Sequence, residues 1–150
     1  MKLVRVQSAP FDPGAEMAGF VRRCTEVDAG GIASFTGLVR GEGGLAALEL
    51  EHFPGMTEQV LNLLAEEAMT RWALSGLVLI HRFGRMAPGE TIVFVATAGR
   101  HRTEALEACT FLIDRLKTDA PFWKKEWHAD GRHKWVEPKA SDDRRADRWR

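Results

Sequence analysis

Residues 91–116 read TIVFVATAGRHRTEALEACTFLIDRL, and this stretch decides the fold class. Thr91 to Ala98 is rich in β-branched and aromatic residues, which predicts a strand. Apolar residues then recur at helical spacing, which predicts a helix that starts near Thr103. The inner face of this helix is expected to hold Leu106, Cys109, Leu112, Ile113 and Leu116. A β-prone strand joined to an amphipathic helix indicates helices packed on a sheet.

Further strands and helices are expected on both sides of this stretch. Asp12-Pro13 and Thr57 are predicted to cap two more helices, because an Asp or Thr side chain can accept a hydrogen bond from a first-turn amide. Strands are predicted at Lys2–Gln7, Ile32–Val39, Leu45–His52, Leu77–His81, Phe122–Trp127 and Lys134–Val136.

Two pairs of these strands are expected to form hairpins, one through residues 40–44 and a closing one through Asp130-Gly131. Hairpins are antiparallel and argue against a purely parallel sheet, while strands and helices are interspersed along the chain. We therefore predict one α+β domain over residues 1–140. A charged, mobile C-terminal tail is expected over residues 141–150.

The composition is that of a globular protein, with 150 residues, 45% of them hydrophobic and 28% charged. The 21 basic and 21 acidic side chains cancel, which argues against a general nucleic-acid binder. Cys24 and Cys109 each fall on the apolar side of a predicted helix, so free core thiols are expected. The sequence has no signal-peptide pattern and no apolar run long enough for a membrane span, and we expect a cytoplasmic protein without membrane contact.

Three motif interpretations fail on their sequence context. Residues 41–46 match a loose glycine-rich dinucleotide pattern, but the segment that follows predicts a strand where that motif needs a helix. His128 and His133 have no cysteine or carboxylate partners at zinc-ligand spacing. No Gly-x-Ser-x-Gly nucleophile motif occurs. We therefore expect no metal and no cofactor.

A basic cluster, Arg100-His101-Arg102, lies between the strand and the helix described first. The first amides of a helix are unpaired and the helix dipole adds positive potential, so a helix start of this kind can bind an anion. Arginine can hold two phosphate oxygens at once. Solvated basic loop residues are the alternative, and both interpretations stay open.

A second group surrounds Lys117, which is predicted to end the same helix. Lys124 and Lys125 follow within a few residues, after the apolar stretch Pro121-Phe122-Trp123. Cations crowded beside apolar surface favour a neutral lysine amine, which can serve as proton donor, base or nucleophile. A lysine stabilised by the helix dipole beside ordinary core aromatics is the alternative, and sequence does not separate the two.

At these residues the chain resembles the large, catalytic subunit family of molybdopterin synthase, and the resemblance extends from about residue 3 to 137. No single matching stretch is specific to this family, but the whole set in this order and spacing is. The matching stretches are Phe35–Arg40, Leu50–Met56, Ile80–Gly84, Pro88–Glu90, His101-Arg102, Leu116–Thr118, Ala120–Glu126 and Trp135–Glu137.

The resemblance implies an α/β-hammerhead fold with an additional antiparallel sheet, and a homodimer of these subunits within a heterotetramer. It implies a small ubiquitin-like sulfur-carrier subunit whose C-terminal Gly-Gly bears a thiocarboxylate. That tail would donate sulfur to cyclic pyranopterin monophosphate and build the molybdopterin dithiolene, a step of molybdenum cofactor biosynthesis.

The resemblance also assigns the site residues. Lys117 and Lys124 fall on catalytic positions, with His101 and Arg102 supplied across the dimer. The substrate-binding positions implied are Leu38, Val39, Arg40, His101, Arg102, Lys117, Lys124, Lys125 and Glu126. The loop Gly41–Gly44 is shorter than is usual in the family, which puts the contacts of that loop in doubt.

Two other functions stay open at this point. A non-catalytic phosphate- or nucleotide-binding module would need the basic cluster but not Lys117. An RNA-binding domain would stack bases on Phe122 and Trp123 and show a steep salt dependence, which the zero net charge argues against.

Overall fold

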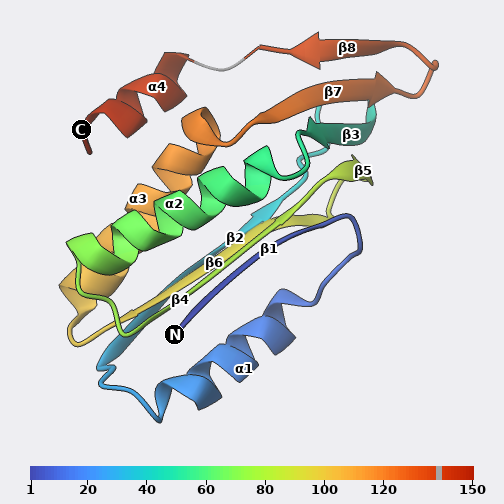
Figure 1. Cartoon of the computed structure of the whole chain (residues 1–150). Coiled ribbons are helices and arrows are strands. Elements are labelled where there is room, and N and C mark those ends of the chain that lie inside the picture. The colour runs from blue at the N-terminus through green and yellow to red at the C-terminus, as the bar shows by residue number, and fades with distance from the viewer. Residues whose placement is uncertain (138–139) are drawn as a thin grey trace.

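Two four-stranded sheets and four helices make up the computed structural model, which describes residues 1–137 and 140–150. The predicted α+β class is confirmed (Figure 1). No helix in these described ranges is both long and apolar enough to span a membrane. In chain order the elements are β1 (Lys2–Gln7), α1 (Pro13–Cys24), β2 (Gly31–Leu38), β3 (Leu45–His52), α2 (Met56–Arg71), β4 (Gly76–Arg82), β5 (Gly84–Met86), β6 (Thr91–Gly99), α3 (Arg102–Asp119), β7 (Phe122–His128), β8 (His133–Val136) and α4 (Ala140–Asp147).

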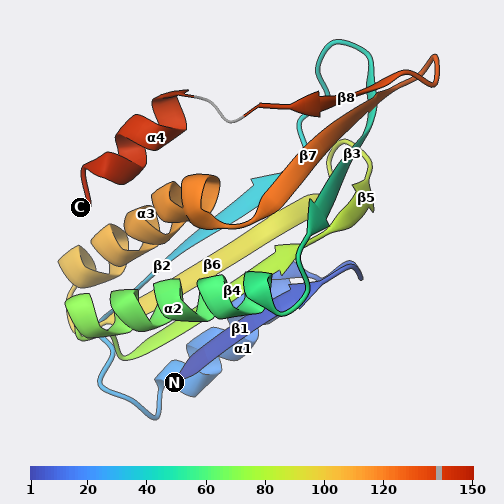
Figure 2. The ribbon, with the colours of Figure 1, turned by 45° about the horizontal axis from the view of Figure 1, so that its top comes forward.

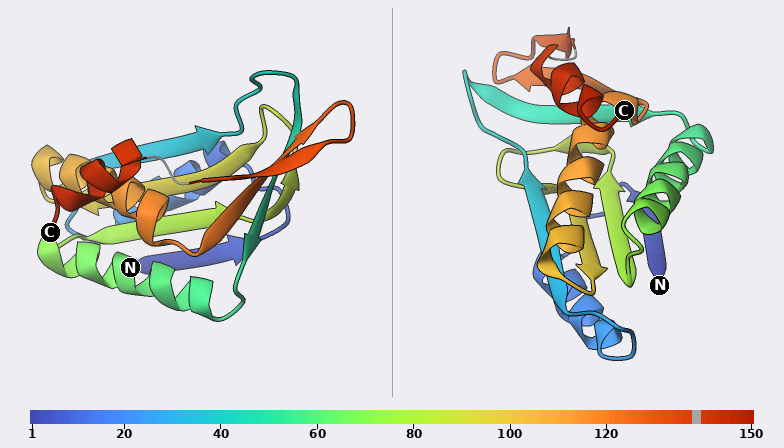
Figure 3. Two further views of the ribbon diagram at one scale, coloured as in Figure 1. Left: turned by 90° about the horizontal axis from the view of Figure 1, so that it is seen from above. Right: turned by 90° about the vertical axis from the view of Figure 1, so that its left-hand side faces the viewer.

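The larger core forms on both faces of the first sheet, whose strand order is β1-β4-β6-β2. Helices α2 and α3 cover one face and α1 covers the other (Figures 1 and 3). Successive strand residues point to opposite faces, so Leu77 and Leu79 of β4 pack toward α2 and α3 while Val78 and Ile80 pack toward α1. Burial on both faces explains why β4 is apolar without alternation.

The second sheet has the order β5-β3-β7-β8 and is antiparallel throughout. The predicted closing hairpin of β7 and β8 is confirmed. The hairpin predicted through residues 40–44 is wrong, because β2 pairs with β6 and β3 pairs with β5 and β7. Residues 39–44 instead carry the chain from one sheet to the other, and Gly43 and Gly44 turn it with φ of 58° and 77° (Figure 2).

Smaller differences between the sequence predictions and the structure have local causes. Thr57 does not cap α2, because its hydroxyl donates to the Phe53 carbonyl at 2.8 Å and Gly55 occupies the cap position. Leu106 is 57% exposed, because the buried face of α3 is made by Ala105, Ala108, Cys109 and Leu112 instead. Strand β5 has only three residues and was not predicted. Cys24 and Cys109 are buried free thiols, as predicted.

The charged C-terminal tail contains one helix. Residues 140–147 form α4, which packs against α3. Beyond it, the Trp149 indole donates to a carboxylate oxygen of Asp114 at 2.7 Å and contacts the rings of Trp72 and Phe111. The many charged residues of the tail predicted a solvated segment. Trp149 contacts the domain through its ring and its indole N–H.

Candidate functional site

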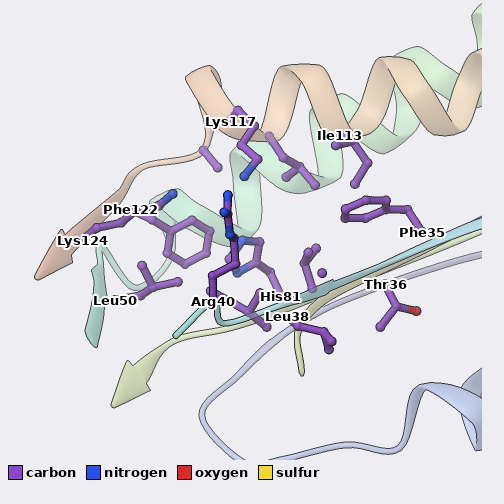
Figure 4. A pocket seen from close by; sticks show the side chains of 15 residues that line it. Phe35, Thr36, Leu38, Arg40, Leu50, His81, Ile113, Lys117, Phe122 and Lys124 are labelled. Atoms are coloured by element: carbon purple, nitrogen blue, oxygen red, sulfur yellow. The ribbon is translucent and has the colours of Figure 1, made fainter. Parts of the chain in front are cut away.

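A cavity of about 410 Å³ lies where the two sheets meet. The end of β2 and residues of β4 and β6 form one wall, and the last turns of α3 form another. Leu50 of β3 and Phe122 of β7 close it from the second sheet (Figure 4). The lining is largely apolar, so charges placed within it are screened less than on an open surface.

Three cations enter this cavity from three different parts of the chain. Arg40 follows the end of β2, Lys117 lies in the last turn of α3, and Lys124 lies on β7. Figure 4 shows the nitrogen-bearing ends of Arg40 and Lys117 pointing toward one another. None of the described lining residues is acidic, although Arg40 pairs with Glu42 in its own loop. This arrangement suits a ligand with an anionic group.

His81, at the end of β4, also lines the cavity and was missed by the sequence analysis. Its ring stacks on Phe122 with centroids 4.1 Å apart and planes 19° apart, and its Nδ1 lies 2.9 Å from the Arg82 carbonyl oxygen. Burial lowers the pKa of His81 to about 4, and the charges of Lys124 and Lys117 add to this effect. The only sequence signal was a histidine ending an apolar strand, which more often indicates a core position.

The structure gathers only some of the residues that were predicted to bind substrate. Leu38, Arg40, Lys117 and Lys124 line the cavity together. Val39 is buried beside Leu50 and Met86 and supports the cavity from behind.

Lys125 and Glu126 lie outside the cavity lining for different reasons. Alternation along β7 turns Lys125 to the opposite face from Lys124, where its ammonium lies over the rings of Trp127 and Trp135. Glu126 shares the face of Lys124, and its carboxylate lies 3.9 Å from the Lys134 ammonium.

His101 and Arg102 lie at the opposite end of α3 from Lys117. Fifteen residues at 1.5 Å each separate them by about 22 Å along the helix axis. Both side chains are exposed. Glu104 accepts from the His101 amide, so the helix start is partly satisfied without a bound anion. Within one chain, no small ligand can touch both Arg102 and Lys117.

Hydrogen bonds join two of the stretches that carry the family resemblance, Ile80–Gly84 and Pro88–Glu90. The buried Arg82 guanidinium donates to Glu90 at 3.0 Å and to the Ser8 carbonyl at 2.9 Å. Hydrogen bonds from the Ala87 amide and Arg82 lower the pKa of Glu90. These contacts tie the turn before β6 to β4, beneath the cavity. In the described ranges, no group of three or more potential metal ligands is close enough to bind an ion.

Comparisons with known proteins agree along most of the chain. The family model described as MoaE protein matches residues 6–119. The chain is 50% identical over 149 residues to the molybdopterin synthase catalytic subunit of Mesorhizobium japonicum, a match that covers 98% of this chain and 92% of that relative. It is 48% identical over 149 residues to the protein of the same name from Pseudomonas aeruginosa, covering 97% of each.

Solved structures give the same result. The molybdopterin biosynthesis MoaE protein from Burkholderia ambifaria superposes with a TM-score of 0.83 at 44% identity, covering 99% of this chain and 98% of that chain. Molybdopterin synthase from Staphylococcus aureus superposes with a TM-score of 0.73 at 27% identity, covering 88% and 95%. The chain therefore belongs to the MoaE family, whose curated relatives are molybdopterin synthase catalytic subunits.

Proposed function

We propose that this chain is the catalytic subunit of a molybdopterin synthase and transfers sulfur to cyclic pyranopterin monophosphate. The sulfur comes from the C-terminal thiocarboxylate of a small ubiquitin-like partner, and the product is the molybdopterin dithiolene. One observation carries the proposal: a largely apolar cavity holds Arg40, Lys117 and Lys124, with no acidic residue among its described lining residues, in a chain half identical to named catalytic subunits.

The cavity chemistry matches what this reaction requires. A phosphorylated pterin brings an anion, which the cations hold, and a flat ring, which apolar walls accept. Lys117 and Lys124 are the catalytic residues of the proposal, because their amines can donate or accept protons beside the reacting thiocarboxylate. Positioning and electrostatics then supply most of the rate.

The proposal includes a homodimer that binds two small partners in a heterotetramer. The distance along α3 supports it, because Arg102 and His101 can reach a substrate near Lys117 only from a second copy of the chain. The reaction is placed in the cytoplasm, a compartment that suits two buried free thiols.

The test is reconstitution. The purified chain is mixed with thiocarboxylated small partner and cyclic pyranopterin monophosphate, and the dithiolene product is measured in single-turnover conditions. Product from the unchanged chain and none from the Lys117→Ala chain supports sulfur transfer. Ligand binding without product, equal in both chains, would instead identify a phosphate- or nucleotide-binding module.

A further inference from the structure

The polar side chains of the cavity differ in whether they can donate or accept hydrogen bonds. Lysine and arginine side chains donate hydrogen bonds and accept none. Arg40, Lys117 and Lys124 therefore offer only donors to a ligand. Among the described lining side chains, only the Thr36 hydroxyl and the His81 ring are left as hydrogen-bond acceptors.

The hydrogen bond at Nδ1 fixes the tautomer of His81. The Arg82 carbonyl oxygen lies 2.9 Å away and can only accept, so Nδ1 carries the hydrogen. In a neutral imidazole the other nitrogen then holds a lone pair. Nε2, at the tip of the side chain, is therefore an acceptor.

The surroundings keep this ring neutral and hold it still. Lys117 of α3, Lys124 of β7 and His52 of β3 all face it, and their charges oppose a second proton on the ring. The stack on Phe122 fixes the plane of the ring. Near neutral pH, Nε2 thus remains an acceptor beside two ammonium groups. A histidine in water would be partly protonated at that pH.

We propose that His81 is a substrate-contacting specificity residue, whose Nε2 accepts a hydrogen bond from an N–H group on the pterin ring. This inference rests on the function proposed above. The substrate has two unlike parts: a cyclic phosphate, which only accepts, and an aminopyrimidine edge, which donates. The cations pair with the first, and without His81 the Thr36 hydroxyl would be the one acceptor left for the second among the described lining side chains.

The experiment measures calorimetric binding of two probes, cyclic pyranopterin monophosphate and inorganic phosphate, to the full chain and its variants. His81→Phe keeps an aromatic ring on Phe122 and removes the acceptor, while His81→Gln keeps an acceptor. His133→Phe is the matched control, because His133 is exposed and also contacts an aromatic ring, that of Trp127.

We expect His81→Phe to weaken pterin binding about tenfold, the usual effect of an unpaired buried donor, and to leave phosphate binding within about twofold. His81→Gln should recover part of the loss, and the control should match the unchanged chain with both probes. Pterin binding by His81→Phe at the original strength overturns the proposal. Equal weakening of both probes also overturns it, because it indicates that His81 only supports the cation cluster. If the unchanged chain binds phosphate but not the pterin, the proposed function itself fails, and this inference with it.

Discussion

At the scale of single residues, the cavity brings like charges together beside a largely apolar lining. Arg40, Lys117 and Lys124 repel one another there; Glu42 pairs with Arg40 in its own loop, but none of the described lining residues is acidic. Such repulsion lowers stability unless a ligand supplies negative charge. A bound phosphate would relieve this repulsion, so we expect the three cations to bind an anionic group of the substrate.

Lys117 is the residue we expect sulfur transfer to need most. Lys117→Ala should abolish dithiolene formation while dimerisation and partner docking persist, because docking depends on a broad surface. Lys117→Arg keeps the positive charge, but a guanidinium neither releases a proton near neutral pH nor acts as a nucleophile. We expect no rescue in single-turnover assays of both variants. Near-normal product from the arginine variant would reduce Lys117 to an electrostatic anchor.

His81 should make stability depend on pH in a defined window. Its folded pKa of about 4 lies below the ordinary value of 6.5, so between these values the unfolded chain binds the extra proton. Stability is fully present above pH 6.5, is lost as the pH falls toward 4, and levels off below that. His81→Phe removes this contribution. The unchanged chain should therefore lose about 2 kcal/mol more than the variant between pH 7 and pH 5, measured by urea unfolding.

Equal losses in the two chains would show that His81 titrates normally. The groups that face the ring are Lys117, Lys124, His52 and the Arg82 carbonyl. All of these groups are present in both chains.

Lys117 and His81 differ in how far the sequence alone can identify them as site residues. Lys117 could be selected as a candidate because a helix end, a proline and nearby lysines mark it locally, although these signals left a lysine stabilised by the helix dipole as the alternative. His81 could not, because its role depends on Phe122 and Lys124, which lie more than forty residues away in sequence and reach it only through the packing of two sheets.

At the scale of elements, periodicity located the strands but not their partners. Strands β2 and β3 are consecutive and joined by a glycine-rich loop, which favours a hairpin in any local reading. They separate because β2 pairs with β6, where Phe35 lies opposite Val95, and β3 pairs in the second sheet, where Leu50 packs beside Phe122. This separation opens the cavity and places Arg40 at its edge.

Helix α4 leads to a stability prediction of its own. The Trp149 indole donates to the buried Asp114 carboxylate, and the Trp149 carbonyl accepts from Arg71 at 2.8 Å. Trp149→Phe keeps an aromatic ring and removes the donor, so we expect a loss of about 1–3 kcal/mol in the free energy of unfolding. Trp135→Phe is the control; Trp135 is 51% exposed, and its change should stay within about 0.5 kcal/mol. Equal effects in urea unfolding would mean that the tail is not anchored through Asp114.

At the scale of the whole molecule, the length of α3 decides what one chain can do alone. His101 and Arg102 mark its start and Lys117 its last turn, about 22 Å apart along the axis. A site that uses both ends must be built from two chains, with the helix start of one copy beside the cavity of the other. Each dimer would then hold two equivalent sites, and each site would take its arginine from one copy and its lysine from the other.

This arrangement can be tested by mixing two inactive chains. Lys117→Ala and Arg102→Ala homodimers each have both sites damaged, so each should be inactive or nearly so. In a mixed dimer, one site carries both substitutions and the other carries neither, because the intact arginine of the first chain faces the intact lysine of the second. Purified mixed dimers, separated with two different affinity tags, should therefore recover about half the activity of the unchanged dimer, by the two-fold symmetry of the assembly. If each site were built within one chain, every site in the mixed dimer would carry one substitution, and its activity would stay at the level of the homodimers.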